Sequence, residues 1–217
     1  MLAAMELQLL SLNTGRKRVI ATLHGENVLS AIGKTPVTVP DIGARALGLD
    51  GDEQADHSVH GGEDKAVYAY PSEHWRWWEA EKNLQCGPGT FGENLTLSGA
   101  DETEVSIGDH FQWGTVVLEV SQPRAPCFKL GLHTGRSDVP GLLTQSARCG
   151  WYLRVLQEGR AGSKETLKRI YHNKTPSVRD TFRALYDSSA GHDLVRTVFE
   201  LPSLARAWKS GLAKRLR

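Results

Sequence analysis

The sequence contains little cysteine and no long apolar run. Its three cysteines, Cys86, Cys127 and Cys149, are widely spaced and form no C-x-x-C pair, which excludes a disulfide framework and a thiol-exchange motif. No segment approaches the roughly 18 apolar residues of a membrane helix. The apolar N-terminal residues are interrupted at Glu6, too early for a secretory signal. We therefore predict a cytoplasmic protein without membrane contact.

The sequence also lacks an excess of either charge, because 26 Lys and Arg face 25 Asp and Glu. This balance gives no reason to expect a polyanionic partner. The charges are unevenly distributed, however. Residues 1–150 hold 12 basic and 19 acidic residues, whereas residues 151–217 hold 14 and 6. Two interpretations remain open: two solvated faces of one protein, or a basic C-terminal segment that contacts an acidic partner.

Short β-type segments separated by Gly, Asn, Asp and Pro dominate the first 150 residues. In one of them Val116, Leu118 and Val120 alternate with other residues and share a face. Such a pattern favours a barrel or a sandwich. The expected strands are Glu6–Leu12, Val19–His24, Pro36–Val39, Ala66–Tyr70, Leu95–Leu97, Val116–Val120 and Trp151–Leu156.

Helical spacing appears in three places. One helix is expected from Ser72 onward and a second, short helix over Gly141–Arg148. The last 50 residues have apolar steps of three, four and seven, with Ser177 and Ser203 as predicted N-caps. We therefore predict a mostly β protein with α-helices, in which residues 1–160 form the barrel and residues 161–217 form a three-helix appendage.

Cys127 follows the clearest strand and lies between Arg124 and Lys129, in a segment that Pro123 and Pro126 stiffen. Cations beside a thiol favour the thiolate, which is the form that attacks an electrophile or binds a metal. The residues alone leave a second interpretation open, a buried and inert cysteine. Cys86 and Cys149 have no comparable neighbours, and we interpret them as structural.

A second segment, residues 48–65, is dense in ionisable side chains and glycine. Its last part reads His60, Gly61, Gly62, Glu63, Asp64 and Lys65. Adjacent glycines let a backbone approach a ligand closely, and His60 and Lys65 supply donors for an anion or a heterocycle. One alternative is a tight turn with solvated charges. Another is a metal pair of His57 and His60 with Asp52 or Asp56, which lacks a third nitrogen or sulfur ligand.

Two further polar residues are candidates. Asn94 can both donate and accept hydrogen bonds, although an Asn at a turn often only satisfies nearby backbone groups. Lys34, in Gly33–Pro36, is a cation for a phosphate or an ordinary surface lysine.

Taken together, these motifs resemble the MOSC domain family, named for the C-terminal domain of molybdenum cofactor sulfurases. They are most similar to its YiiM-type subgroup of 6-hydroxylaminopurine-resistance proteins. The resemblance rests on GLDGDEQADHSVHGGEDKAVYAYPSEHW (48–75), FGENLTLSG (91–99), IGD (107–109), LEVSQPRAPCFKLG (118–131) and GWYLRVLQEG (150–159). The chain departs from the family pattern after Gly159, where a Gly-Asp-type turn is expected before another strand.

The resemblance implies a β-barrel with a cofactor cleft and a three-helix (3-alpha) extension. The implied cofactor is molybdenum bound to molybdopterin, with no requirement for pyridoxal phosphate. Cys127 is implied to be the catalytic residue and the thiolate ligand of molybdenum. The residues implied to hold the pterin phosphate are Lys34, Lys65, Arg124, Gly61 and Gly62. His60 and Asn94 would bond the pterin or the substrate, with Asp56 orienting His60.

The implied activity is the reduction of N-hydroxylated bases such as 6-hydroxylaminopurine to amines, a detoxification reaction. No flavin, haem or iron–sulfur motif is present, so electrons are expected from a separate reductase, and the resemblance implies that this reductase is a flavoprotein. We hypothesise that it docks on the basic C-terminal helices. The residues that motivate this docking are Arg206, Lys209, Lys214, Arg215 and Arg217.

Two other functions remain open. One is a sulfur carrier that holds a persulfide on Cys127, and the other is a non-catalytic module that binds an anion. Stable nucleic-acid binding is not expected, because no aromatic stacking motif is present. The apolar faces of the C-terminal helices are compatible with a homodimer.

Overall fold

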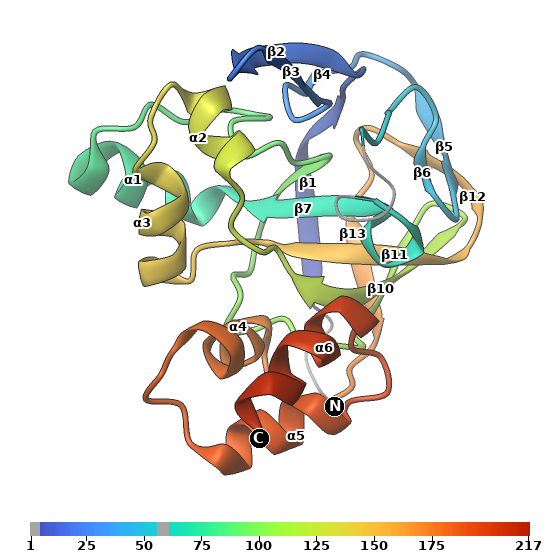
Figure 1. The fold of residues 1–217 in the computed structure, drawn as a ribbon. Helices are drawn as coiled ribbons and strands as arrows, with labels where there is room; N and C mark the ends of the chain where they lie inside the picture. Colours follow the sequence, from blue (N-terminus) through green and yellow to red (C-terminus); the bar gives the residue numbers. More distant parts are fainter. Residues whose placement is uncertain (1–4, 56–60) are drawn as a thin grey trace.

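Seven strands close into a barrel within residues 5–55 and 61–217, the part of the chain that the computed structural model describes (Figure 1). Around the barrel they follow the order β13-β9-β10-β11-β7-β8-β1, and β13 pairs with β1 to close it. The strands are β1 (Glu6–Thr14), β7 (Val67–Pro71), β8 (Leu95–Ser98), β9 (His110–Trp113), β10 (Val116–Pro123), β11 (Trp151–Gln157) and β13 (Leu167–Tyr171). The predicted fold class, mostly β with α and built on a barrel, is confirmed.

Large apolar side chains fill the barrel. Val116, Leu118 and Val120, predicted to share a face, are fully buried, and so are Trp113 and Trp151. Full burial of one such side chain stabilises the fold by about 1.5–3 kcal/mol. The alternation read from β10 therefore identifies the inward face of a central strand.

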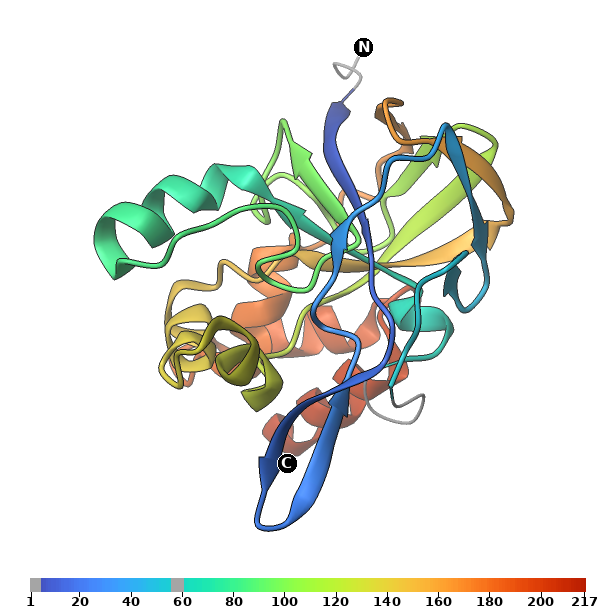
Figure 2. The ribbon, with the colours of Figure 1, turned by 90° about the horizontal axis from the view of Figure 1, so that it is seen from above.

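Two smaller sheets flank the barrel. β5 (Asp41–Arg45) pairs with β6 (Gly48–Leu49) and with β12 (Gly159–Gly162). β2 (Arg18–Leu23) and β3 (Glu26–Ser30) form a hairpin that extends away from the barrel (Figure 2). β4 (Thr35–Pro36) pairs with the end of β1. The strand expected over Pro36–Val39 is thus only partly present: Pro36 lies in β4 and the Val37 N–H donates to the Leu12 carbonyl at 2.9 Å, and the pairing with β1 ends there.

The parallel pair β7 and β8 requires a crossover connection. This connection contains the 3₁₀ helix η2 (Ser72–His74) and helix α1 (Trp75–Lys82), where a helix was predicted. Helices α2 (Phe128–Thr134) and α3 (Val139–Ser146) follow β10, and α3 overlaps the short helix expected over Gly141–Arg148.

The chain ends with helices α4 (Val178–Tyr186), α5 (His192–Glu200) and α6 (Arg206–Arg215), as predicted. Ser177 caps α4, because its Oγ accepts from the Asp180 N–H at 3.0 Å. The predicted cap at Ser203 is wrong. α6 begins after Ala205, and the Ser203 hydroxyl instead donates to Glu119 Oε1 at 2.7 Å.

The C-terminal helices share the hydrophobic core of the barrel. Phe182, Leu204 and Leu212 are buried in the same cluster as the barrel residues. The boundary expected after residue 160 falls within β12, and β13 beyond it pairs with both β1 and β9. Sheet structure therefore continues to Tyr171, past the point where the sequence departs from the family pattern.

Arg215 has a structural role. Its guanidinium donates to the carbonyl oxygens of Ala184 and Asp187 at 2.8 and 2.7 Å, and so closes the C-terminal end of α4. The docking hypothesis then rests on Arg206, Lys209, Lys214 and Arg217, and it stays a prediction. Every helix among the described residues is too short or too polar to cross a membrane.

Candidate functional site

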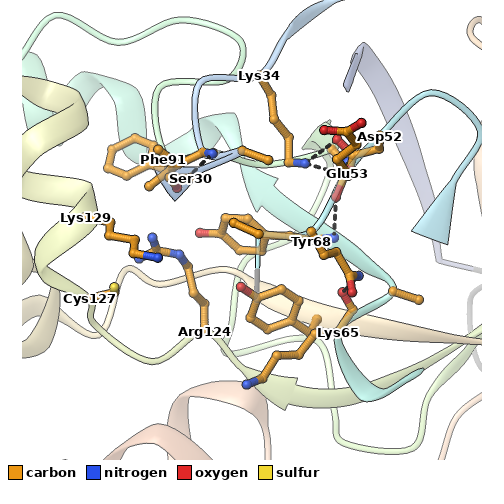
Figure 3. Close-up of a pocket in the computed structure, with 18 of the residues that line it drawn as sticks. Ser30, Lys34, Asp52, Glu53, Lys65, Tyr68, Phe91, Arg124, Cys127 and Lys129 are labelled. Carbon is orange, nitrogen blue, oxygen red and sulfur yellow. Dashed lines mark hydrogen bonds and ion pairs between the residues drawn. The ribbon is translucent and has the colours of Figure 1, made fainter. Parts of the chain in front are cut away.

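A cleft of about 710 Å³, including the part open to solvent, lies where β7, β8 and β11 begin and β10 ends (Figure 3). Loops after β3 and β6 complete its walls, together with the 3₁₀ helix η1 (Glu63–Lys65). The structure brings five of the sequence-predicted residues to this cleft: Lys34, Lys65, Asn94, Arg124 and Cys127. His60 and its expected partner Asp56 lie outside the described residues, as does His57.

Cys127 lies on the wall formed by the segment between β10 and α2. Its backbone is extended, with φ −144° and ψ 138°, and it immediately precedes the first residue of α2. The side chain is half-buried and lines the cleft together with Arg124 and Lys129. The thiol is thus within a polar, cationic environment instead of the apolar core.

Arg124 is the most deeply buried cation of the cleft, with 5% of its surface exposed. Its guanidinium carbon lies 5.4 Å from the centre of the Tyr68 ring, a cation–π contact. Nη1 is buried and has no hydrogen-bond partner among the described residues. A buried donor without an acceptor costs about 1–3 kcal/mol. This atom therefore favours an acceptor supplied by a ligand in the cleft.

Lys34 is already paired within the protein. Its Nζ donates to both carboxylate oxygens of Asp52 at 2.5 Å, and both side chains are less than a tenth exposed. Burial lowers the pKa of Lys34, and the neighbouring Asp52 carboxylate opposes this effect. From the sequence, Asp52 is a candidate only as an alternative metal ligand. A lysine and an aspartate 18 positions apart give no local signal that they form a pair.

Asn94 is engaged by protein groups as well. Its Oδ1 accepts from the Tyr68 N–H at 3.1 Å, and its Nδ2 donates to the Asn13 carbonyl and to Asp52 Oδ2 at 3.2 and 2.9 Å. The Gly15 N–H donates to the other Asp52 oxygen at 2.7 Å. Asn94 therefore fixes Asp52 and the start of β7, and its expected contact with a ligand stays a prediction.

Lys65 and Lys129 supply cations from opposite parts of the rim (Figure 3). The ammonium of Lys129 donates to the Leu29 carbonyl at 3.0 Å. Gly61 and Gly62 are not among the described residues that line the cleft. The Gly62 N–H, expected to face a phosphate, donates to Gln54 Oε1 at 3.0 Å. This glycine has a positive φ of 90°, so it serves the turn into η1.

A turn at residues 148–150 supports the floor of the cleft. Within it, the Cys149 carbonyl accepts from the Tyr68 hydroxyl at 2.8 Å, and the Gly150 carbonyl accepts from the Arg124 N–H at 3.3 Å. The Gly150 N–H in turn donates to Glu102 Oε1 at 2.6 Å. Tyr68 and Arg124 thus depend on a part of the chain that does not itself reach the ligand space.

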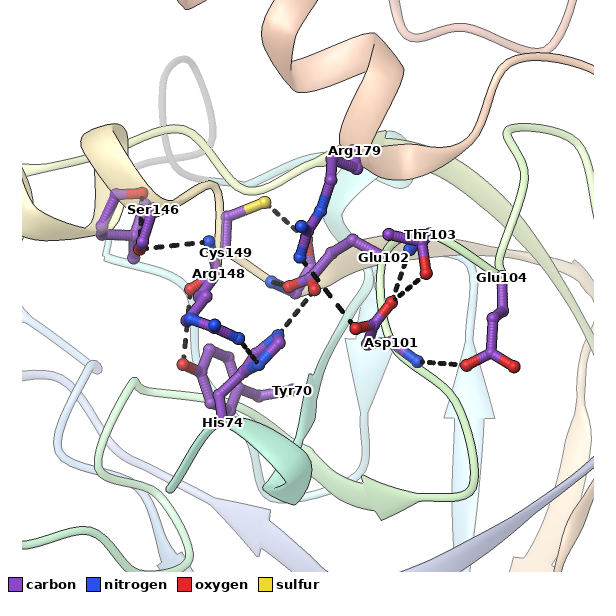
Figure 4. A network of polar contacts seen from close by, with 12 residues as sticks. Tyr70, His74, Asp101, Glu102, Thr103, Glu104, Ser146, Arg148, Cys149 and Arg179 are labelled. Carbon is purple, nitrogen blue, oxygen red and sulfur yellow. Dashed lines mark hydrogen bonds and ion pairs between the residues drawn. The ribbon is translucent and has the colours of Figure 1, made fainter. Parts of the chain in front are cut away.

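The buried side chains of Glu102 and His74, together with the partly buried Arg148, hold this turn (Figure 4). Glu102 Oε2 lies 2.6 Å from His74 Nε2, and Arg148 Nη1 lies 2.8 Å from His74 Nδ1. Because an arginine can only donate, Nδ1 must accept, and Nε2 then carries the hydrogen that faces the carboxylate. Each of the three side chains is therefore assigned as a hydrogen-bond donor or acceptor in its contacts. Glu102 also accepts from the Gly150 N–H and so connects the three side chains to the turn.

The three cysteines differ in their surroundings, and this gives a testable difference in reactivity. Burial raises the pKa of Cys86 to about 12, and the neighbouring Glu79 and Glu93 carboxylates add to the effect. Burial also raises the pKa of Cys149. At pH 8 we expect iodoacetamide to alkylate Cys86 about 100- to 1,000-fold more slowly in the folded protein than in urea, because only the thiolate reacts. Peptide mass spectrometry measures this ratio, and equal rates in both states would contradict it.

The cleft combines one soft ligand atom with an excess of positive charge. Its charged lining residues are Lys34, Lys65, Arg124 and Lys129, against Asp52 and Glu53. Asp52 is paired with Lys34, and the other three cations line the cleft with it. Such a site can hold an anionic ligand that carries a soft metal ion, because the cations would bind the anionic part and the thiolate would bind the metal.

Comparison with known proteins places the chain among relatives of similar size. The MOSC domain family model matches residues 56–168. Protein YiiM of Escherichia coli is 34% identical over 196 residues, which cover 88% of this chain and 87% of that protein. The crystal structure of YiiM from Geobacillus stearothermophilus has a TM-score of 0.81 and 32% identity, and the match covers 97% of this chain and all of that one.

A third relative is longer. A protein of Gibberella moniliformis named "Reductase" is 36% identical over 166 residues, which cover 75% of this chain but only 29% of that protein. The fungal protein therefore contains a large additional portion with no counterpart in this alignment.

Proposed function

Since this chain belongs to the MOSC domain family, and since its cleft places a thiol among cations, we propose that it is a molybdenum-cofactor-dependent oxidoreductase. The proposed reaction is the reduction of N-hydroxylated bases and related compounds, such as 6-hydroxylaminopurine, to amines.

The residues present fit this cofactor. The observation that carries the proposal is the buried Arg124 Nη1 without a partner, in the same cleft as the half-buried Cys127. A guanidinium matches the paired oxygens of a phosphate, and a thiolate is a soft ligand suited to a metal with sulfur ligands. Arg124, Lys65 and Lys129 would hold the anionic part, and Cys127 would hold the metal.

When bound, the cofactor supplies the two-electron redox chemistry. Conversion of an N-hydroxyl group to an amine and water also consumes two protons. Lys34 holds protons at Nζ on the cleft wall, and Asp52 keeps this ammonium in place. Tyr68, packed on Arg124, keeps the guanidinium oriented toward the cleft.

We also propose that electrons arrive from a separate flavoprotein reductase. The fungal relative named "Reductase" supports this arrangement, because this chain corresponds to only 29% of its length.

The proposal is tested on protein made in a host that synthesises molybdenum cofactor. Molybdenum analysis and pterin fluorescence measure loading, and conversion of 6-hydroxylaminopurine is followed with a chemical reductant and with a flavoprotein reductase. Near-stoichiometric molybdenum with amine formation supports the proposal. Absence of pterin and of amine, even after addition of free cofactor, contradicts it. Release of thiocyanate on treatment with cyanide would instead indicate a sulfur carrier.

Replacing Arg124 by glutamine should weaken cofactor retention. A hydrogen bond to a charged group contributes about 1.5–3 kcal/mol, so the pterin retained after extensive dialysis should correspond to roughly 10- to 100-fold weaker binding. Arg124→Lys keeps the positive charge but lacks the planar guanidinium, so its pterin retention should lie between those of the wild type and Arg124→Gln. Arg45→Gln, which removes an exposed arginine with two ion-pair partners, is the control. Unchanged retention in Arg124→Gln would remove this residue from the cofactor site.

A further inference from the structure

Arg154 joins three parts of the molecule that are distant in sequence. It lies on β11, directly opposite Glu119 of β10. One guanidinium nitrogen, Nη1, donates to Glu119, while Nε and Nη2 donate to Asp64 Oδ1 at 3.0 and 2.7 Å. Nη2 also donates to the Ser203 carbonyl at 3.0 Å. The guanidinium thus contacts the barrel, the short helix η1 and the segment that leads into α6.

Ser121 makes a second connection between the same parts. Its hydroxyl contacts the Asp64 and Tyr152 carbonyls at 2.6 and 3.1 Å. Its own carbonyl accepts from the Ala205 N–H at 3.0 Å. Asp64 is therefore held through its side chain by Arg154 and through its backbone by Ser121, and both of these residues are also bonded to Ser203–Ala205.

These connections end at the cleft. Lys65 follows Asp64 in η1, and both Lys65 and Tyr152 line the cleft. η1 has only 3 residues, too few to hold its own position by helical hydrogen bonds. The contacts of Asp64 therefore help to set the position of Lys65, together with Gln54, whose Nε2 donates to the Lys65 carbonyl at 3.2 Å.

We propose that Arg154 and Ser121 are positioning residues that hold Lys65 at the cleft by fastening η1 to the barrel and to the C-terminal helices. The helices then contribute to the affinity of the cleft for an anionic ligand, independently of any docking role. The part that concerns ligand affinity rests on the proposed function. The part that concerns the position of η1 does not.

Amide hydrogen exchange, measured by mass spectrometry, tests the position of η1 without any ligand. The variants are Arg154→Gln and the milder Asp64→Asn, which keeps the side-chain shape at a partly exposed position. We expect exchange of residues 61–66 to accelerate about tenfold or more, as for loss of a charge-assisted hydrogen bond. Arg160→Gln, which breaks an exposed ion pair on β12, should leave this segment unchanged. Arg154→Lys should partly restore slow exchange.

Cofactor-loaded protein provides a second measurement. Pterin retention should fall several-fold in Arg154→Gln and Asp64→Asn, whereas turnover per bound molybdenum should stay at the wild-type value. Wild-type exchange rates at 61–66 in both variants would overturn the proposal, and so would an equal acceleration throughout the barrel. If wild-type protein neither binds pterin nor reduces substrate, the proposed function fails, and the exchange measurement alone decides the role of Arg154.

Discussion

Cys127→Ser is expected to lose bound molybdenum and, with it, reduction of 6-hydroxylaminopurine. The serine hydroxyl is similar in size but is a hard oxygen donor, a poor substitute for a thiolate on a soft metal centre. Removing a group that merely orients a metal ligand weakens binding by about 10- to 100-fold, so loss of the ligand itself should exceed about 100-fold. Molybdenum content and amine formation per protein are the measurements.

Cys86→Ser is the matched control for this variant. Cys86 is also half-buried but does not line the cleft; it packs against the edge of the core, and its thiol donates to the Leu84 carbonyl at 3.4 Å. Both variants should fold, because neither thiol belongs to the fully buried core. Only Cys127→Ser should lose the metal. Retained molybdenum and turnover in Cys127→Ser would remove Cys127 from the mechanism.

Glu102→Ala is expected to cause the largest loss of stability. Glu102 is fully buried, and its removal leaves the Gly150 N–H and the His74 Nε2–H without acceptors, beside the positive charge of Arg148. Removing one partner of a buried ionic network costs about 3–5 kcal/mol. For a chain of this size each kcal/mol lowers the melting temperature by about 2–4 °C. Thermal unfolding followed by circular dichroism should therefore show a fall of roughly 6–20 °C.

Two neighbouring variants make this prediction specific. Glu102→Gln keeps an acceptor for Gly150 but presents its amide to the hydrogen on His74 Nε2, so it should still be strongly destabilised. Glu104→Gln changes a carboxylate in an exposed contact with the Asp101 N–H, and its stability should change by less than about 0.5 kcal/mol. Equal melting temperatures for Glu102→Ala and Glu104→Gln would show that the buried network contributes little.

The features that could be predicted from sequence are those whose causes are local. The alternation of Val116, Leu118 and Val120 identified a central strand, and Ser177 was correctly predicted to cap α4, because its bond spans three residues. The same reasoning failed for Ser203. Its hydroxyl donates to Glu119, which is 84 positions away, and no local sequence pattern predicts so distant a partner.

In the candidate site, too, some features could be predicted from the sequence and others depend on contacts between distant segments. The gathering of Cys127, Arg124 and Lys65 at one cleft was implied by the resemblance to the MOSC domain family, whereas the residue types alone suit anion and metal binding without bringing the segments together. The internal pairing of Lys34 with Asp52, and the contacts that engage Asn94, depend on the approach of separate loops. In the sequence Lys34 is a candidate phosphate cation or a surface lysine, and Asn94 is a candidate ligand contact or a partner for nearby backbone groups; only the fold shows the protein groups that both contact.

The pairing of β1 with β13 has a consequence for the order in which the protein assembles. Leu7 lies opposite Leu167 in this pair, so β1 is synthesised about 160 residues before the strand that closes the sheet. Until then β1 presents an unpaired edge, and open edges promote association with other chains. Polypeptides that terminate before residue 167 should therefore aggregate. Only chains that extend through β13 can therefore close the barrel.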